Sequence, residues 1–200
     1  MRFLITFLFV LIFVSCTQGK QKLSGENEWQ QKMNADFKDA TKSPLKAKDL
    51  KVFKRLDFFS IDSIFAVEAI LNRTPESEWF NMKTTTGTLR KERIYGILNF
   101  ELKDRKFQLN VYQGEEVIQE EDYKDYLFLP FLDNTNGTSS YDGGRYIDLR
   151  IPQGNTIELD FNKSYNPYCA YNDKYSCPIV PRSNYLDIKI EAGTKNYIKH

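Results

Sequence analysis

The sequence is poor in the residue that most often carries protons in enzymes: it holds one histidine, His200, among 200 residues. Histidine-activated nucleophiles, histidine metal clusters and histidine acid–base catalysis are therefore disfavoured. A charge bias is missing as well, because 28 lysines and arginines face 27 aspartates and glutamates. With no basic excess and no matching motif, we expect no nucleic-acid partner. At 41% hydrophobic and 28% charged residues, the composition is that of one ordinary globular domain.

Long hydrophobic runs are also missing, with one exception near the start of the sequence. Residues 3–14 are apolar apart from one threonine, and Arg2 precedes them. The run is shorter than the roughly 20 residues that a helix needs to cross a bilayer. A serine and Cys16 follow it, and then a polar stretch, which resembles the signal of a bacterial lipoprotein. The resemblance implies a signal peptide over residues 1–15, lipidation of Cys16 and a flexible tether over 16–26; an ordinary secretory signal is the alternative.

A chain lipidated at Cys16 would be attached to a membrane of the bacterial cell envelope, and we expect it to face the periplasm, on the outer membrane. Removal of the signal takes away Arg2 and leaves equal numbers of cationic and anionic residues. Attachment would therefore depend on the lipid and not on attraction to an anionic surface.

Two further cysteines, Cys169 and Cys177, remain in the sequence. In an oxidising periplasm such a pair predicts a disulfide bond. Seven residues separate them and no histidine is at hand, which fits neither zinc-ligand spacing nor the two-residue spacer of thiol oxidoreductases. Two free thiols are the remaining alternative.

A helix is expected to begin after Asn27, which can cap it, with Gln30 at the third helical position. Apolar residues then recur at helical spacing: Trp29, Met33, Phe37 and Ala40. This stripe predicts a face that docks on the core, with a partner-binding helix as the alternative. Ser43 and Pro44 are expected to end the helix.

Beyond residue 60 the apolar period changes from near four to two, which predicts strands. Seven runs suit strands: residues 65–71, 94–102, 107–111, 126–131, 147–151, 157–161 and 186–190. Polar turns at 103–105 and 152–155 predict two hairpins. Hairpins without intervening helices predict a mainly β fold, an antiparallel sandwich or barrel of about eight strands with one N-terminal helix. Residues 27–200 are expected to form this single domain.

The last third of the chain carries the most specific motifs. They include Gly143-Gly144-Arg145-Tyr146, Asp160-Phe161-Asn162, Asn166-Pro167-Tyr168-Cys169-Ala170, Cys177-Pro178 and Ala192-Gly193. These motifs resemble the bacterial family catalogued as domain of unknown function 1684, and the resemblance extends over nearly all of residues 27–195. Val180, Tyr185 and Thr194 depart from the family pattern. The resemblance supports the extent of the domain and implies no activity.

Polar side chains gather near the ends of the predicted strands in this part of the chain. The candidate binding residues are Asp142, Arg145, Asp148, Asp160, Asn162, Tyr165 and Asn166. If the strands on either side of the turn at 152–155 pair with each other, Arg145 and Asn162 meet at one end of that hairpin. An arginine between carboxylates and amides can bind a planar anion or a pair of sugar hydroxyls. The structural alternative is that Asp142 belongs to a turn and Arg145 neutralises Asp160.

Tyrosines are concentrated in the same region, and four of them surround the cysteine pair: Tyr165, Tyr168, Tyr171 and Tyr175. Their rings suit either stacking on a ligand or a small satellite core around the two cysteines.

Metal and cofactor signals are weak. Residues 133–137 begin like a calcium loop, but glycine stands at position five, and position twelve is Gly144 instead of glutamate. No phosphate-binding or dinucleotide glycine motif is present. We therefore expect neither a metal nor a cofactor.

Three functions are compatible with these observations. The leading hypothesis is a lipid-anchored periplasmic module that binds a small molecule or glycan through residues 142–148 and 160–166. The first alternative is an envelope interaction protein without a ligand. The second is a hydrolase whose acid and base are carboxylates among Asp142, Asp148 and Asp160.

Overall fold

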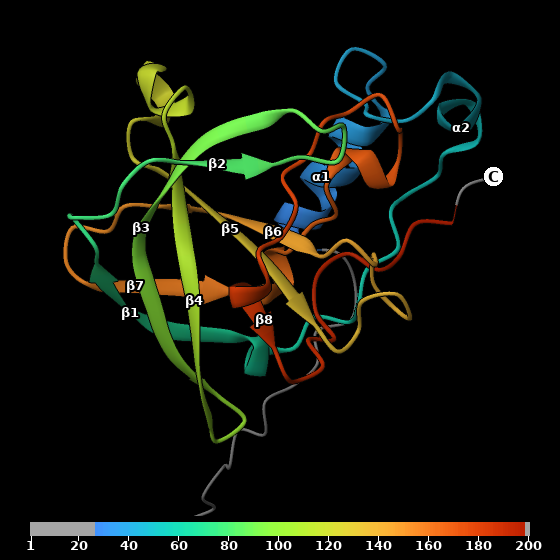
Figure 1. Cartoon of the computed structure of the whole chain (residues 1–200). Coiled ribbons are helices and arrows are strands. Elements are labelled where there is room, and N and C mark those ends of the chain that lie inside the picture. The colour runs from blue at the N-terminus through green and yellow to red at the C-terminus, as the bar shows by residue number, and fades with distance from the viewer. Residues whose placement is uncertain (1–26, 199–200) are drawn as a thin grey trace, which may run out of the picture.

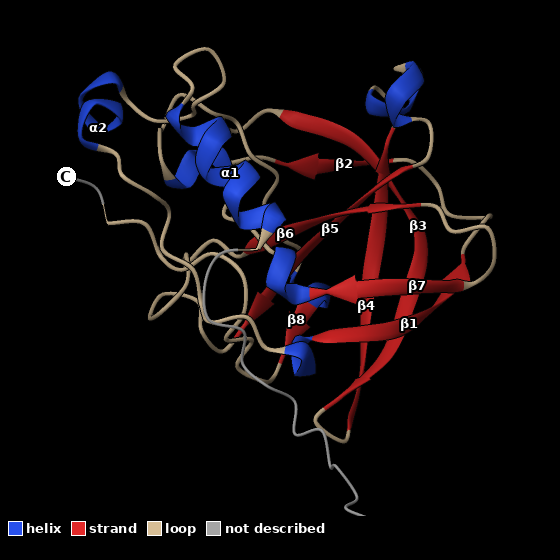
Figure 2. Ribbon diagram, turned by 180° about the vertical axis from the view of Figure 1, so that it is seen from behind, coloured by secondary structure: helices blue, strands red, loops and turns tan. Residues whose placement is uncertain are grey.

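The computed structural model describes residues 27–198. A curled sheet forms a half-barrel, and the two α-helices lie together on one side of it (Figure 1 and Figure 2). The strands are β1 (Ala66–Arg73), β2 (Phe80–Lys83), β3 (Leu89–Leu102), β4 (Arg105–Gly114), β5 (Tyr126–Asp133), β6 (Arg145–Arg150), β7 (Thr156–Asp160) and β8 (Tyr185–Leu186). The helices are α1 (Glu28–Lys38) and α2 (Ala47–Val52), with short 3-10 helices η1 (Ser63–Phe65), η2 (Val117–Gln119), η3 (Glu121–Tyr123), η4 (Phe161–Lys163), η5 (Tyr168–Ala170) and η6 (Arg182–Asn184). The predicted mainly β fold, with about eight strands and a helix near the N-terminus, is confirmed.

Hydrogen bonds order the sheet as β6-β5-β4-β3-β1-β7, with β2 paired to β3 and β8 to β5. The hairpin predicted around residues 103–105 is confirmed as β3 and β4. Leu102 pairs with Arg105, and the residues between them, Lys103 and Asp104, have φ angles of 51° and 58°. Positive φ at both central residues is what a type I′ turn requires, and the twist of that turn matches the twist of the flanking strands.

The hairpin predicted across residues 152–155 is wrong. The chain turns there, but β6 pairs with β5 and β7 pairs with β1, so the two strands lie at opposite ends of the strand order. The segment that follows β7 nevertheless returns to β6, where Tyr146 and Tyr165 exchange two backbone hydrogen bonds of 2.9 Å. Turn residues show where a chain reverses, whereas the partner of a strand depends on residues far away in the sequence.

Two further strands differ from the prediction. The short strand β2, paired with β3, has no clear alternation and was missed. The run at 186–190 is a strand only at Tyr185–Leu186, which pairs in parallel with β5. Ile190 lies beyond this short strand, and its carbonyl accepts a hydrogen bond from the side chain of Arg145 at 2.8 Å.

Alternate strand residues fill the interior of the half-barrel. The interior core includes Leu98, Leu109, Leu127, Leu129, Phe131, Leu159 and Phe161. A register shift in β3 between Ile94 and Gly96 changes which residues face inward. Even-numbered residues of β3 therefore face the core after this bulge, as Leu98 does, while Glu92 before it lies on the opposite face of the sheet.

Helix α1 begins as predicted. The Asn27 side chain accepts a hydrogen bond from the Gln30 backbone N–H at 2.8 Å, and the Gln30 side chain accepts one from the Asn27 N–H at 3.3 Å, which forms a capping box. The helix ends at Lys38, before the predicted Ser-Pro stop, where Asp39 is extended and its carboxylate accepts hydrogen bonds from the Thr41 N–H and hydroxyl at 2.9 and 2.7 Å. The ring of Phe37 packs against Tyr171 with 4.8 Å between centroids, and Met33 packs against the same cluster, so this part of the predicted apolar stripe docks on the body of the protein. Ala40, the last residue of the predicted stripe, lies beyond the helix and is exposed. In the described part of the chain, no helix has the length and apolar character needed to cross a bilayer.

Candidate functional site

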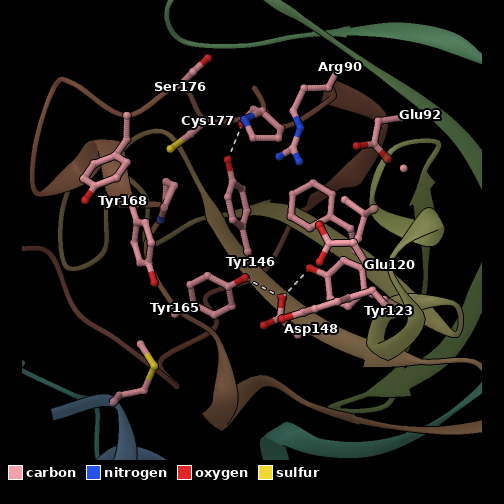
Figure 3. Close-up of a pocket in the computed structure, with 18 of the residues that line it drawn as sticks. Arg90, Glu92, Glu120, Tyr123, Tyr146, Asp148, Tyr165, Tyr168, Ser176 and Cys177 are labelled. Carbon is pink, nitrogen blue, oxygen red and sulfur yellow. Dashed lines mark hydrogen bonds between the residues drawn. The ribbon is translucent and has the colours of Figure 1, made fainter. Parts of the chain in front are cut away.

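A cleft of about 550 Å³ opens on the face of the sheet that is opposite the interior core (Figure 3). The strand register explains its floor, since Phe128 of β5 pairs with Asp148 of β6. Helix α1 and the segment after β7 add walls. The aromatic lining residues are Trp29, Tyr123, Tyr126, Phe128, Tyr146, Tyr165, Tyr168 and Tyr175.

Asp148 is held in this cleft by two tyrosines. The hydroxyls of Tyr126 and Tyr165 both donate to Asp148 Oδ1, at 2.8 and 2.6 Å (Figure 3). Burial raises the pKa of both hydroxyls, and the adjacent Asp148 charge raises it further. The two hydroxyls therefore stay protonated and keep the carboxylate in one position.

The rings behind Asp148 meet almost at right angles. Tyr146 lies 4.7 Å from Phe128 with 79° between the ring planes, and 5.9 Å from Tyr165 with 87° between them. The hydroxyl of Tyr146 donates to the backbone carbonyl of Pro178. This contact joins β6 to the cysteine-containing segment that forms the upper wall in Figure 3.

Glu92 lines the same cleft and was not predicted as a site residue. Its side chain is 3% exposed, and its Oε2 has no hydrogen-bond partner. Burial raises the pKa of Glu92 to about 7, against a smaller lowering by the charge of Arg90. Gly114 makes room for the carboxyl group, because a Cβ at that position would lie 3.1 Å from Glu92 Oε1. Sequence periodicity placed Glu92 in phase with the core residues of β3, and only the bulge turns it toward the cleft.

Arg145 lies outside the cleft, fully buried with its partner Asp133. Its Nη2 donates to Asp133 Oδ2 at 2.7 Å and to the Ile190 carbonyl at 2.8 Å, and its Nη1 donates to the Ala192 carbonyl. The carboxylate that neutralises it is therefore Asp133 and not Asp160. With no exposed surface for a ligand, Arg145 joins the C-terminal segment to the sheet.

The remaining candidates are also separated from Asp148. Asp160 accepts hydrogen bonds from the backbone and side chain of Asn162 at 3.0 and 2.9 Å, and Asn162 donates to the Asp62 carbonyl at 2.9 Å. Asn166 donates to the Lys195 carbonyl at 2.8 Å. Asp142 is exposed on its turn and is not part of the cleft lining. Of the seven candidates, the structure brings Asp148 and Tyr165 together in the cleft.

The two cysteines are neighbours but carry free thiols. The Cys169 backbone N–H donates to Cys177 Sγ at 3.2 Å, and Cys177 lines the cleft. A hydrogen bond from the Cys177 thiol lowers the pKa of Cys169 to about 6, whereas the same contact raises the pKa of Cys177. The disulfide bond stays a prediction, and the lipidation site Cys16 lies outside the described residues.

The tyrosines near the cysteines divide between the two predicted roles. Tyr165, Tyr168 and Tyr175 line the cleft, while Tyr171 is buried in a separate cluster against Phe37. Within residues 27–198, no group of three or more histidine, cysteine or acidic side chains is arranged to hold a metal ion.

The fold and the cleft define a mainly β protein whose half-barrel carries a recess on its outer face. The chain matches the family described as "Protein of unknown function (DUF1684)" over residues 51–195, and it belongs to this family. It is also similar to the solution NMR structure of an uncharacterized protein of Haloarcula marismortui, with 31% identity and a TM-score of 0.67. That similarity covers 86% of this chain and 92% of the other. A search of curated proteins gave no match.

Two of the motifs that resemble the family meet at Arg145. The arginine of the Gly-Gly-Arg-Tyr turn donates to the carbonyl of Ala192, in the Ala-Gly motif. Gly193 has a φ of 75°, and a Cβ there would lie 2.1 Å from Ser164 Oγ. The close approach of the C-terminal segment therefore requires glycine at this position.

Proposed function

We propose that the protein is a binding module of the bacterial cell envelope, lipid-anchored at Cys16 and facing the periplasm, that holds a small molecule or a glycan in the cleft. The observation that carries the proposal is the carboxylate of Asp148, positioned by two tyrosine hydroxyls within an aromatic-lined recess. Such a combination of apolar walls and a few polar groups is typical of ligand sites.

The Asp148 cluster supports binding because it is prepared before a ligand arrives. Asp148 Oδ1 already accepts two hydrogen bonds, while its Oδ2 accepts none from the described residues. The second oxygen is therefore available to a ligand, and the rings of Phe128 and Tyr146 offer apolar surface beside it. A group held in place in advance loses little conformational freedom on binding.

The geometry favours binding over hydrolysis by two carboxylates. The carboxyl groups that line the cleft belong to Asp148 of β6, Glu92 of β3 and Glu120. Hydrolysis as predicted from the sequence needs two carboxyl groups among Asp142, Asp148 and Asp160, one on each side of the scissile bond. The other proposed carboxylates, Asp142 and Asp160, do not line the cleft.

Native mass spectrometry of the full-length chain, purified from a bacterial envelope in a non-ionic detergent, tests the binding proposal. We expect a small adduct that is present in the native spectrum and absent after denaturation. The variant Asp148→Asn should lose it, whereas Asp142→Asn, which changes a carboxylate outside the cleft, should keep it. A wild-type chain that is free of adducts, and that binds no member of a small-molecule and oligosaccharide library, would contradict the proposal.

The anchor needs a separate test because Cys16 lies outside the described residues. Cells that express the full chain can be labelled with an alkyne-tagged fatty acid. We expect the protein to carry the label and to fractionate with the outer membrane, and Cys16→Ser to abolish both. A labelled Cys16→Ser chain, or an unlabelled wild type, would contradict lipid anchoring.

A further inference from the structure

The charged groups that line the cleft are unequal in number. Glu92, Glu120 and Asp148 contribute carboxyl groups, and Arg90 contributes the opposing charge (Figure 3). An excess of carboxyl groups within a recess attracts cations and repels anions.

The hydrogen-bonding groups around Asp148 are mostly acceptors. Tyr126 and Tyr165 donate their hydroxyl protons to Asp148, and Tyr146 donates its proton to the Pro178 carbonyl. Each of these hydroxyls can still accept a hydrogen bond but has no second proton to donate. A ligand that hydrogen-bonds to these three hydroxyls or to Asp148 must therefore bring donors, and an ammonium group brings donors only.

Glu92 gives an independent indication of what the ligand carries. It is nine-tenths or more buried, it lines the cleft, and its Oε2 has no partner. A buried carboxyl oxygen without a partner is unfavourable, and polar atoms of this kind are normally satisfied. A donor from a ligand would supply the missing contact, and a cationic donor would compensate the charge as well.

The distance between Glu92 and Asp148 indicates the shape of the ligand. Along the curled sheet their strands are separated by three strand spacings, roughly 14 Å. Phe128 lies on β5, one of the strands between them, and the plane of its ring makes an angle of 79° with the ring of Tyr146. A ligand that reaches both carboxyl groups must be elongated and must present apolar surface or cationic character to these rings.

We propose that the cleft binds a linear polyamine cation, with one ammonium group at Asp148, another at Glu92, and the methylene chain along the aromatic wall between them. This inference rests on the proposed binding function and names the ligand class of the same cleft. The charge excess, the acceptor-rich floor and the unpartnered Glu92 oxygen all favour a donor-only, positively charged ligand over a neutral glycan.

Isothermal titration calorimetry with spermidine, on the full-length chain in non-ionic detergent, tests the inference. The control ligand is triacetylspermidine, which keeps the carbon chain but lacks the charges. We expect spermidine to bind at least about 10-fold more tightly than its acetylated form. Asp148→Asn and Glu92→Gln should each weaken spermidine about 10-fold, and Asp142→Asn should leave its affinity unchanged.

The shorter diamine putrescine tests the two-ended geometry. Because its ammonium groups are closer together, we expect weaker binding that responds to only one of the two substitutions in the cleft. Thermal unfolding of each variant verifies that it is folded before its affinity is compared.

The outcomes separate this inference from the proposed function. The inference is overturned if spermidine binds no more tightly than triacetylspermidine, or if Asp148→Asn and Glu92→Gln both leave its affinity unchanged. If a neutral oligosaccharide then binds and Asp148→Asn weakens it, the binding function stands without the polyamine. If neither spermidine nor any neutral ligand binds, both proposals fail.

Discussion

Glu92 is the buried carboxyl group whose replacement makes the sharpest test of the electrostatics described above. Its pKa in the folded protein is about 7, compared with an ordinary value of 4.5. A raised folded-state pKa means that the protonated carboxyl stabilises the fold below pH 4.5, and that this stabilisation is lost as the pH rises to about 7. The loss amounts to about 1.4 kcal/mol per pH unit in that interval. Between about pH 5 and pH 9 the contribution of Glu92 should therefore fall by about 3 kcal/mol.

Glu92→Gln removes this titration while it keeps the shape of the side chain. The assay is urea unfolding of both proteins, without ligand and under reducing conditions, at five pH values between about 5 and 9. We expect the difference in unfolding free energy, variant minus wild type, to rise by about 3 kcal/mol across this range and to level off above about pH 7. Other titrating groups, including Cys169, occur in both proteins and cancel in the difference. A difference that does not change with pH would show that Glu92 has an ordinary pKa, and it would refute the reasoning that an unpaired carboxyl group is buried here.

Three further predictions follow from the rest of the structure. Arg145→Ala should lower the unfolding free energy by about 3–5 kcal/mol, because it leaves the buried Asp133 without its partner; a loss below about 1 kcal/mol in urea unfolding would contradict this. Gly193→Ala should cost at least about 2 kcal/mol in the same assay, since the residue has a φ of 75° and no room for a Cβ; an unchanged midpoint would argue against the described path of the C-terminal segment. Mild oxidation should join Cys169 to Cys177, lower the mass by two hydrogens and raise the unfolding free energy by about 2–3 kcal/mol; a persistent pair of alkylatable thiols would exclude the bond.

Local sequence rules predicted the elements that depend on neighbouring residues. The capping box of Asn27 and Gln30 and the turn at Lys103 and Asp104 both appear in the structure where the sequence placed them. Both depend on backbone groups within a few residues, so their chemistry can be read from a short window. The turn at 152–155 was also found, but its strands pair elsewhere, because strand pairing is decided by contacts far apart in the chain.

The residues of the candidate site were likewise predicted from the sequence only in part. Asp148 and Tyr165 were predicted because polar and aromatic residues gather near strand ends, and the backbone bridge between Tyr146 and Tyr165 brings them together. Arg145 belonged to the same sequence cluster, yet its partners are Asp133 and carbonyls at the end of the domain, which no local pattern indicates. Glu92 was missed because a bulge reverses the face of β3.

Local residue patterns predicted the period-two strands, the helix cap and the tight turns, because each depends on the chemistry of a few adjacent residues. Tertiary structure alone decided which side chains share the cleft. The positions of Asp148, Tyr126 and Glu92 relative to one another follow from the strand order, the register and one bulge. A shift of one residue in the register, or loss of the bulge, would turn a side chain to the other face of the sheet.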